Sequence, residues 1–143
     1  MKKVLVIDDD AHIARLVKAA LDIVKVEHAL DYCSDGGQGR GKALRGGYDL
    51  ICLDLSMPFM DGFEALEEIK QHSKSAHIPV VVITGEQEPE VHQRVMKLGA
   101  AAIVTKPFEP LYLAEILQQV LAGQEPEPPH GAGPGSDLRR LGT

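Results

Sequence analysis

Four short runs of uninterrupted apolar residues recur along this chain, and they constrain its fold more than any other feature. They are VLVI, LICL, VVVI and AAIV, at residues 4–7, 50–53, 80–83 and 101–104. A strand that is covered on both faces has this kind of sequence, and parallel sheets are built from such strands. A weaker run, VEHALDYC, is a fifth candidate and lies between the first two. The pattern therefore favours a parallel sheet.

Segments with apolar residues at helical spacing separate these runs. They cover residues 13–24, 63–69, 91–98 and 113–120, and apolar residues three and four positions apart lie on one face of a helix. Pro89 suits the first turn of the third of these helices, and Gly99 suits its C-terminal cap. Right-handed crossovers fold repeated βα units into a doubly wound sheet. We therefore expect an α/β fold with a single five-stranded parallel sheet.

The connection between the second and third expected strands differs from the others. Residues 35–47, DGGQGRGKALRGG, hold six of the fourteen glycines in the chain. Each glycine inside a helix costs about 1 kcal/mol relative to alanine. Any helix in this segment should be short and weak.

The end of the chain has the composition of a linker. Residues 123–143 are rich in proline and glycine and have few apolar side chains, which is typical of flexible chain. We expect one folded domain over residues 1–122 and a flexible tail or linker over residues 123–143.

Composition and charge exclude several classes of protein. The net charge is −6 and the chain has no basic stripe, whereas nucleic-acid binding requires cationic side chains that neutralise phosphates. No segment has the length of a membrane span or the pattern of a signal peptide. We therefore expect a cytoplasmic protein that contacts neither nucleic acid nor a membrane directly. Cys33 and Cys52 lack metal-ligand spacing and should be buried apolar residues.

Polar residues follow the four apolar runs, at the points where the expected strands end. Asp8, Asp9 and Asp10 follow the first run and Asp54 the second, while Thr84 and Lys106 follow the third and fourth. Parallel strands present their carboxyl ends at one edge of the sheet, where ligands bind. Clustered carboxylates need raised pKa values or a bound cation, and oxygen ligands suit Mg²⁺. We expect a magnesium site at this edge.

Four motifs stand in order at these strand ends. VIDDD follows the first strand, LDLSMPFMDG the third, ITG the fourth and TKPF the fifth. With these motifs the chain resembles a receiver domain of the response-regulator family of two-component signalling, similar to the chemotaxis regulators, over roughly residues 1–122. The resemblance implies a flavodoxin-like sheet with the strand order 2-1-3-4-5.

The resemblance also implies a function and its partners. The protein would be a phosphorylation-dependent signalling switch and not a turnover enzyme on an external substrate. A sensor histidine kinase or a phosphotransfer protein would supply the phosphoryl group, and a downstream effector or output domain would read the signal. A homodimer is a further possible assembly in such a family.

The metal site follows from the same resemblance. Asp54 would be the phosphoacceptor, because carboxylates serve as nucleophiles of this kind. Asp9 and Asp54, with the backbone carbonyl of Ser56, would bind Mg²⁺. Asp8 would act through water and through its negative charge.

Two further side chains would assist the transfer. The Lys106 ammonium, with Mg²⁺, would neutralise charge that develops on the transferred group. Thr84 would form a hydrogen bond with a phosphoryl oxygen once the group arrives. Ser56 and Glu86 occupy places that tune the lifetime of the phosphoryl group in this family.

Two other functions fit parts of the sequence. A phosphatase of the haloacid-dehalogenase type also uses an Asp nucleophile and Mg²⁺, in an Asp-x-Asp-x-Thr pattern. Here Asp8-x-Asp10 is followed by His12 in place of threonine, and the chain is too short for a cap domain. The other alternative is a receiver-like interaction module that works without phosphorylation, although all the expected chemical positions are filled.

Some residues have simpler interpretations or depart from the family pattern. Asp10 should cap the helix that begins near Ala11, and Asp61 should begin another helix. Gly85 stands where a small residue with a Cβ is usual. Ile103 stands where the family often has an aromatic side chain that reports phosphorylation. It would either join an apolar partner surface or fill space between the last two helices.

Overall fold

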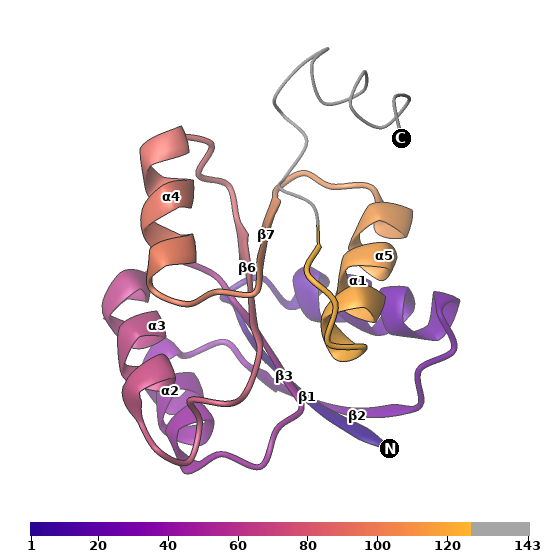
Figure 1. Ribbon diagram of the computed structural model, residues 1–143, viewed down its shortest axis with the longest axis horizontal. Helices are drawn as coiled ribbons and strands as arrows, with labels where there is room; N and C mark the ends of the chain where they lie inside the picture. Colours follow the sequence, from indigo (N-terminus) through magenta and orange to yellow (C-terminus); the bar gives the residue numbers. More distant parts are fainter. Residues whose placement is uncertain (127–143) are drawn as a thin grey trace.

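The computed structural model describes residues 1–126, which form a five-stranded parallel sheet with helices on both faces (Figure 1). The strands of this sheet are β1 (Lys2–Ile7), β2 (His28–Cys33), β3 (Leu50–Leu53), β6 (Val80–Thr84) and β7 (Ala102–Thr105). Their order is β2-β1-β3-β6-β7, and every neighbouring pair is parallel. Counted among these five strands alone, the order is 2-1-3-4-5. The predicted fold class and strand order are confirmed.

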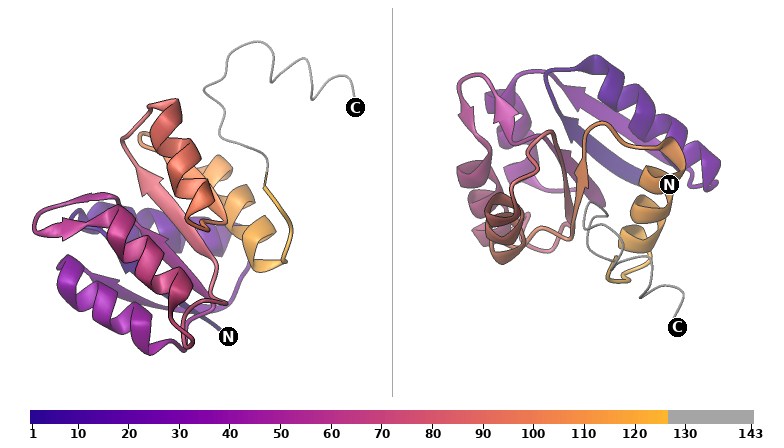
Figure 2. Two further views of the ribbon diagram at one scale, coloured as in Figure 1. Left: turned by 60° about the vertical axis from the view of Figure 1, so that its left-hand side comes forward. Right: turned by 90° about the horizontal axis from the view of Figure 1, so that it is seen from above.

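The helices of residues 1–126 lie in two layers. They are α1 (Ala11–Ile23), α2 (Gly36–Arg45), α3 (Gly62–Gln71), α4 (Pro89–Lys97) and α5 (Pro110–Leu121). Helices α1 and α5 pack together on one face of the sheet, and α2, α3 and α4 cover the other (Figures 1 and 2). None of the helices in this part of the chain is both long and apolar enough to cross a membrane.

The sheet is buried on both faces because successive residues of a strand point in opposite directions. Val4 and Val6 lie in the core beneath α1 and α5, whereas Leu5 and Ile7 lie in the core on the other face. All four side chains are at most 1% exposed. Both cysteines are free thiols buried in these cores, as predicted. This burial on two sides explains why the strand sequences are continuous apolar runs.

The predicted helix ends are confirmed. The Asp10 carboxylate accepts a hydrogen bond of 2.9 Å from the His12 N–H and caps α1. Asp61 caps α3 in the same way. Helix α4 begins at Pro89, and Gly99, with a φ of 108°, follows its C-terminal end. Local sequence therefore determines where these helices begin and end.

Helix α2 forms despite its glycines. It has ten residues, as many as α3, so the expectation of a short helix is wrong. A Cβ at Gly36 would lie 2.7 Å from Met60 Sδ, and a Cβ at Gly39 would lie 2.7 Å from Ile7 Cγ2. These two glycines let α2 approach its neighbours closely, and this packing outweighs their low helix propensity. The predicted weakness of the segment stays a prediction.

A small hairpin follows β3, and the sequence analysis did not predict it. Strands β4 (Ser56–Met57) and β5 (Met60–Asp61) pair antiparallel. Phe59 lies in the turn between them with a φ of 61° and a fully exposed side chain. The hairpin begins two residues after Asp54, and it therefore borders the expected site.

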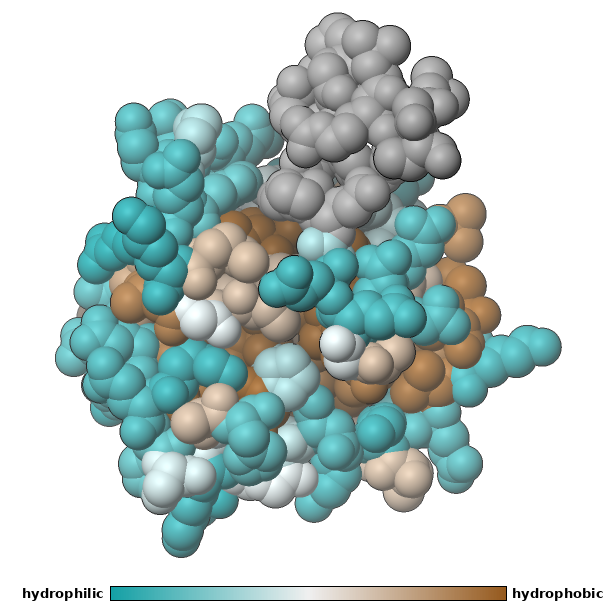
Figure 3. Space-filling model, in the orientation of Figure 1, coloured by the Kyte–Doolittle hydropathy of each residue, from teal (hydrophilic) through white to brown (hydrophobic). Residues whose placement is uncertain are grey.

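Two remaining expectations concern the surface and the tail. Ile103 is 2% exposed and packs in the core on the α3 and α4 side, so its placement on a partner surface is wrong and it fills the interior. Apolar surface does appear between α4 and α5, with hydrophilic residues around it (Figure 3). Residues 127–143 lie outside the described residues, so the boundary of the domain and the nature of the tail stay predictions.

Candidate functional site

The strand order brings four predicted site residues to one edge of the sheet. Asp8 follows β1, Asp54 follows β3, Thr84 ends β6 and Lys106 follows β7. These four strands are consecutive neighbours in the parallel sheet. Their carboxyl ends therefore lie side by side, as expected for a ligand site in an open α/β sheet.

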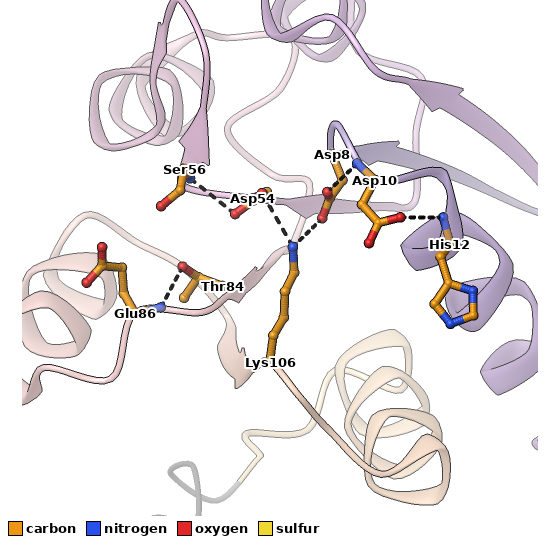
Figure 4. Close-up of polar contacts among 8 residues, drawn as sticks. All are labelled: Asp8, Asp10, His12, Asp54, Ser56, Thr84, Glu86 and Lys106. Atoms are coloured by element: carbon orange, nitrogen blue, oxygen red, sulfur yellow. Dashed lines mark hydrogen bonds and ion pairs between the residues drawn. The ribbon is translucent and has the colours of Figure 1, made fainter.

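Lys106 lies between two of the aspartates (Figure 4). Its Nζ lies 2.9 Å from Asp8 Oδ2 and 3.4 Å from Asp54 Oδ2. Asp8 and Asp54 are only 1% and 4% exposed. Charged groups that are buried this deeply require partners, and the Lys106 ammonium partners both carboxylates at once.

The pKa values of this group follow from burial and from charge. Burial raises the pKa of Asp8, and the hydrogen bond from Lys106 only partly offsets that effect. Burial by itself would lower the pKa of Lys106, but its hydrogen bond to Asp8 and the charges of Asp8 and Asp54 outweigh burial and raise it. Lys106 is therefore held as a cation, whereas the ionised form of Asp8 is disfavoured.

Backbone N–H groups hold both buried aspartates in place. The Asp10 N–H donates to Asp8 Oδ1 at 2.9 Å, and the Ser56 N–H donates to Asp54 Oδ1 at 3.1 Å (Figure 4). Each carboxylate thus has one oxygen fixed by the loop that follows its own strand, and its other oxygen is directed toward Lys106. The two acids are positioned by local loop structure before any ligand binds.

The acidic residues also form a candidate cation site. Asp8, Asp9 and Asp54 each offer a carboxylate oxygen, and these oxygens lie within 4.8 Å of one another. Asp9 is exposed, whereas the other two are buried. Carboxylate oxygens without His or Cys are the ligand set of a hard divalent ion such as Mg²⁺. The cluster therefore fits the predicted metal.

Thr84 belongs to the same edge but is engaged within its own loop. It is fully buried, and its Oγ1 accepts a hydrogen bond of 3.1 Å from the Glu86 N–H (Figure 4). Sequence reasoning found Thr84 and missed this contact, because nothing in the local sequence specifies which donor a threonine hydroxyl takes. The only general signal for it is the tendency of threonine hydroxyls to form hydrogen bonds with nearby backbone groups.

Comparisons with known proteins identify the family of this chain. The family model for the response regulator receiver domain matches residues 4–118. The transcriptional regulatory protein ResD of Bacillus subtilis is 33% identical over 108 residues, which cover 76% of this chain and 43% of ResD. The chemotaxis response regulator CheY4 of Vibrio cholerae is 32% identical, with a TM-score of 0.73, and the match covers 84% of this chain and 98% of that one.

A further similar solved structure is one of a metal-bound response regulator. The structure of the Mn²⁺-bound form of response regulator Rcp1 is 29% identical, with a TM-score of 0.70, over 84% of this chain and 91% of that one. This chain spans about half or less of the length of the curated relatives that it matches, 43% for ResD. The matched family model, the shared fold and these relatives show that the chain belongs to the response regulator receiver domains of two-component signalling.

Proposed function

We propose that this protein is a phosphorylation-dependent switch in which Asp54 accepts a phosphoryl group from a histidine of a partner kinase or phosphotransfer protein. The single observation that carries the proposal is the position of Lys106, which contacts both Asp54 and Asp8 at the carboxyl edge of the sheet. A cation beside a carboxylate nucleophile is what phosphoryl transfer requires, because negative charge gathers on the transferred group.

The transfer itself needs few protein groups. An oxygen of Asp54 attacks phosphorus, the new O–P bond forms as the N–P bond of phosphohistidine breaks, and the electron pair leaves with the imidazole, which takes up a proton. Lys106 neutralises charge on the transferred oxygens. Thr84 would then form a hydrogen bond with one of these oxygens, since its hydroxyl proton is available while its oxygen accepts from Glu86.

Mg²⁺ fits the acidic cluster, and it would be held by Asp9 and Asp54 with the Ser56 carbonyl, while Asp8 acts through water. The clustering of three carboxylates supports this assignment, and Rcp1, a response regulator, binds Mn²⁺ in its solved structure. When bound, the ion would supply positive charge to the phosphoryl oxygens. The chain's own contribution is to hold Asp54 by the Ser56 N–H at 3.1 Å.

The partners belong to the same proposal. A sensor histidine kinase or phosphotransfer protein would donate the phosphoryl group, and a downstream effector or output domain would read the change, with a homodimer as one possible assembly. The chain would not itself contact nucleic acid, and it would assist its own phosphorylation and dephosphorylation without turning over an external substrate. The expected cytoplasmic location is part of this proposal.

The decisive experiment is labelling of Asp54. Incubation with acetyl phosphate and Mg²⁺ should add one phosphoryl group to the wild type and none to Asp54→Asn, as read by mass spectrometry of the intact protein. Asp49→Asn is the matched control, because Asp49 precedes β3 just as Asp54 follows it, and it should be labelled normally. Chelation of Mg²⁺ should abolish labelling. Equal labelling of wild type and Asp54→Asn would refute the assignment, and no labelling of the wild type would favour a module that works without phosphorylation.

A further inference from the structure

A histidine on α4 holds the loop that follows Thr84. The His92 Nε2 lies 2.7 Å from the backbone carbonyl oxygen of Glu86. A carbonyl oxygen can only accept, so Nε2 carries the proton and donates it. The site already described does not use this contact, which ties the first turns of α4 to the loop between β6 and α4.

The contact continues to the site through Glu86. The N–H of Glu86 donates to Thr84 Oγ1 at 3.1 Å, and its carbonyl accepts from His92 at 2.7 Å. Both hydrogen-bonding groups of one backbone residue are therefore engaged, one toward the buried hydroxyl and one toward the helix. These two bonds form a continuous connection from the Thr84 hydroxyl through Glu86 to His92.

Few residues of α4 are fully buried, which gives the bond between His92 and Glu86 its importance. Within the described residues, α4 buries only Val95, whereas α1 buries five residues. Glu88, the N-cap of α4, makes no side-chain capping hydrogen bond. A Cβ at Gly85 would meet nothing within 4 Å. Open space therefore lies beside Gly85. The other contacts of α4, which are Val91 packed against the core and Arg94 over the Phe63 ring at 4.1 Å, begin at its third residue.

We propose that His92 is a positioning residue of the switch: it holds the loop of Thr84 and Glu86 in the conformation seen here and releases it on phosphorylation. The inference rests on the proposed function, because it requires a phosphoryl group on Asp54 that attracts the Thr84 hydroxyl. Glu86 follows the hydroxyl, its carbonyl leaves His92, and the start of α4 becomes free to shift. The bond to His92 thus favours the unphosphorylated form.

Variants of His92 can be matched by the number of bonds between Cβ and the nitrogen that donates the hydrogen bond. The Nε2 atoms of histidine and glutamine stand the same number of bonds from Cβ, so His92→Gln retains a donor at this distance. His92→Asn places its donor one bond short, and His92→Ala has none. His77, exposed and before the opposite end of β6, supplies a control in His77→Ala. His92 is only partly buried, so all these variants should fold.

The measurement is the affinity for beryllofluoride with Mg²⁺, an analogue of the phosphoryl group. The chain has no tryptophan, so binding is followed by NMR of backbone amides. Loss of a hydrogen bond made only in the unphosphorylated form should tighten binding about fivefold, or about 1 kcal/mol, in His92→Ala and His92→Asn. His92→Gln should bind within twofold of the wild type, and His77→Ala should be unchanged.

A second readout separates this inference from the proposed function. In the protein without beryllofluoride, ¹⁵N shifts of the His92 ring should show the proton on Nε2, and His92→Ala should shift the Glu86 and Thr84 amide signals. A proton on Nδ1 of neutral His92, or equal beryllofluoride affinity in all four variants, would overturn the role of His92 alone. Failure of the wild type to bind beryllofluoride would refute the proposed function instead.

Discussion

Two glycines of α2 should respond in opposite ways to the same substitution. Gly41→Ala adds a methyl group where nothing lies within 4 Å of a Cβ. Gly39→Ala adds one only 2.7 Å from Ile7 Cγ2 and 2.8 Å from Ile7 Cγ1. Both positions lie inside the same helix, so the gain in helix propensity is the same and the surroundings alone differ.

The magnitudes follow from these distances. Replacing a glycine inside a helix by alanine stabilises the folded protein by about 1 kcal/mol. Gly41→Ala should be more stable than the wild type by that amount. At Gly39 the same gain opposes an overlap with Ile7, which is 1% exposed and has a stiff branched side chain. Overpacking of this kind costs about 1–3 kcal/mol. If the overlap costs about 2 kcal/mol, the free energy of unfolding of Gly39→Ala should be about 1 kcal/mol below that of the wild type. The two variants should then differ in this free energy by about 2 kcal/mol.

Urea denaturation of the two variants and the wild type measures this difference. A gap of about 2 kcal/mol corresponds to a separation of about 1 M between the two midpoints for a domain of this size. Amide exchange across residues 36–45 should slow in Gly41→Ala. If Gly39→Ala proved as stable as Gly41→Ala, the Ile7 side chain would be free to move aside, and close packing would no longer explain the glycine at position 39.

Two further predictions concern the site itself. Because burial raises the pKa of Asp8 above its ordinary value of 3.8, the folded protein binds this proton more tightly than the unfolded chain. Ionisation of Asp8 then reduces stability as pH rises through the raised pKa. In metal-free buffer, the stability of the wild type relative to Asp8→Asn should fall as the pH rises from about 4 through the raised pKa of Asp8. A difference that stays constant or rises in urea denaturation over this range would contradict the prediction. Gly62→Ala would place a Cβ 2.5 Å from the Cα of Leu55, the residue that follows Asp54. The substitution should therefore destabilise the folded protein by about 2–3 kcal/mol and slow the phosphoryl labelling of Asp54. Normal stability and normal labelling would show that the backbone at Leu55 can move aside.

The meeting of the strand-end residues was predictable from one sequence pattern and one rule of sheet geometry. Continuous apolar runs identified strands buried on both faces, and parallel strands must end at a common edge. Asp54 and Lys106 are 52 residues apart in sequence, yet this rule places them together without any knowledge of loop structure. The caps at Asp10 and Asp61 were predictable for a simpler reason, since capping depends on residues that are adjacent in sequence.

The failures concern contacts between segments. The length of α2 depends on the fit of Gly39 against Ile7, and a propensity scale contains no information about that fit. Ile103 was assigned either to a partner surface or to the interior. Its strand, β7, lies at the edge of the sheet, and the sequence alone does not show how far the neighbouring helices cover an edge strand. The bond between His92 and Glu86 joins a side chain to a backbone carbonyl six residues earlier, and no residue preference marks it.

The charges of the site bear on the role of a cation in the proposed phosphorylation. Asp8, Asp9 and Asp54 against the single ammonium of Lys106 leave an excess of two negative charges (three minus one) when all are ionised. The raised pKa of Asp8 relieves part of this excess while the protein is unphosphorylated. Under the proposed function, phosphorylation replaces the single negative charge of the Asp54 carboxylate with the about −1.5 to −2 charges of a phosphoryl group, so the site becomes still more negative. Lys106 already contacts two carboxylates. Under the same proposal, a divalent cation at Asp8, Asp9 and Asp54 would add positive charge beside the phosphoryl group, and the stability of the phosphorylated form should depend on that cation.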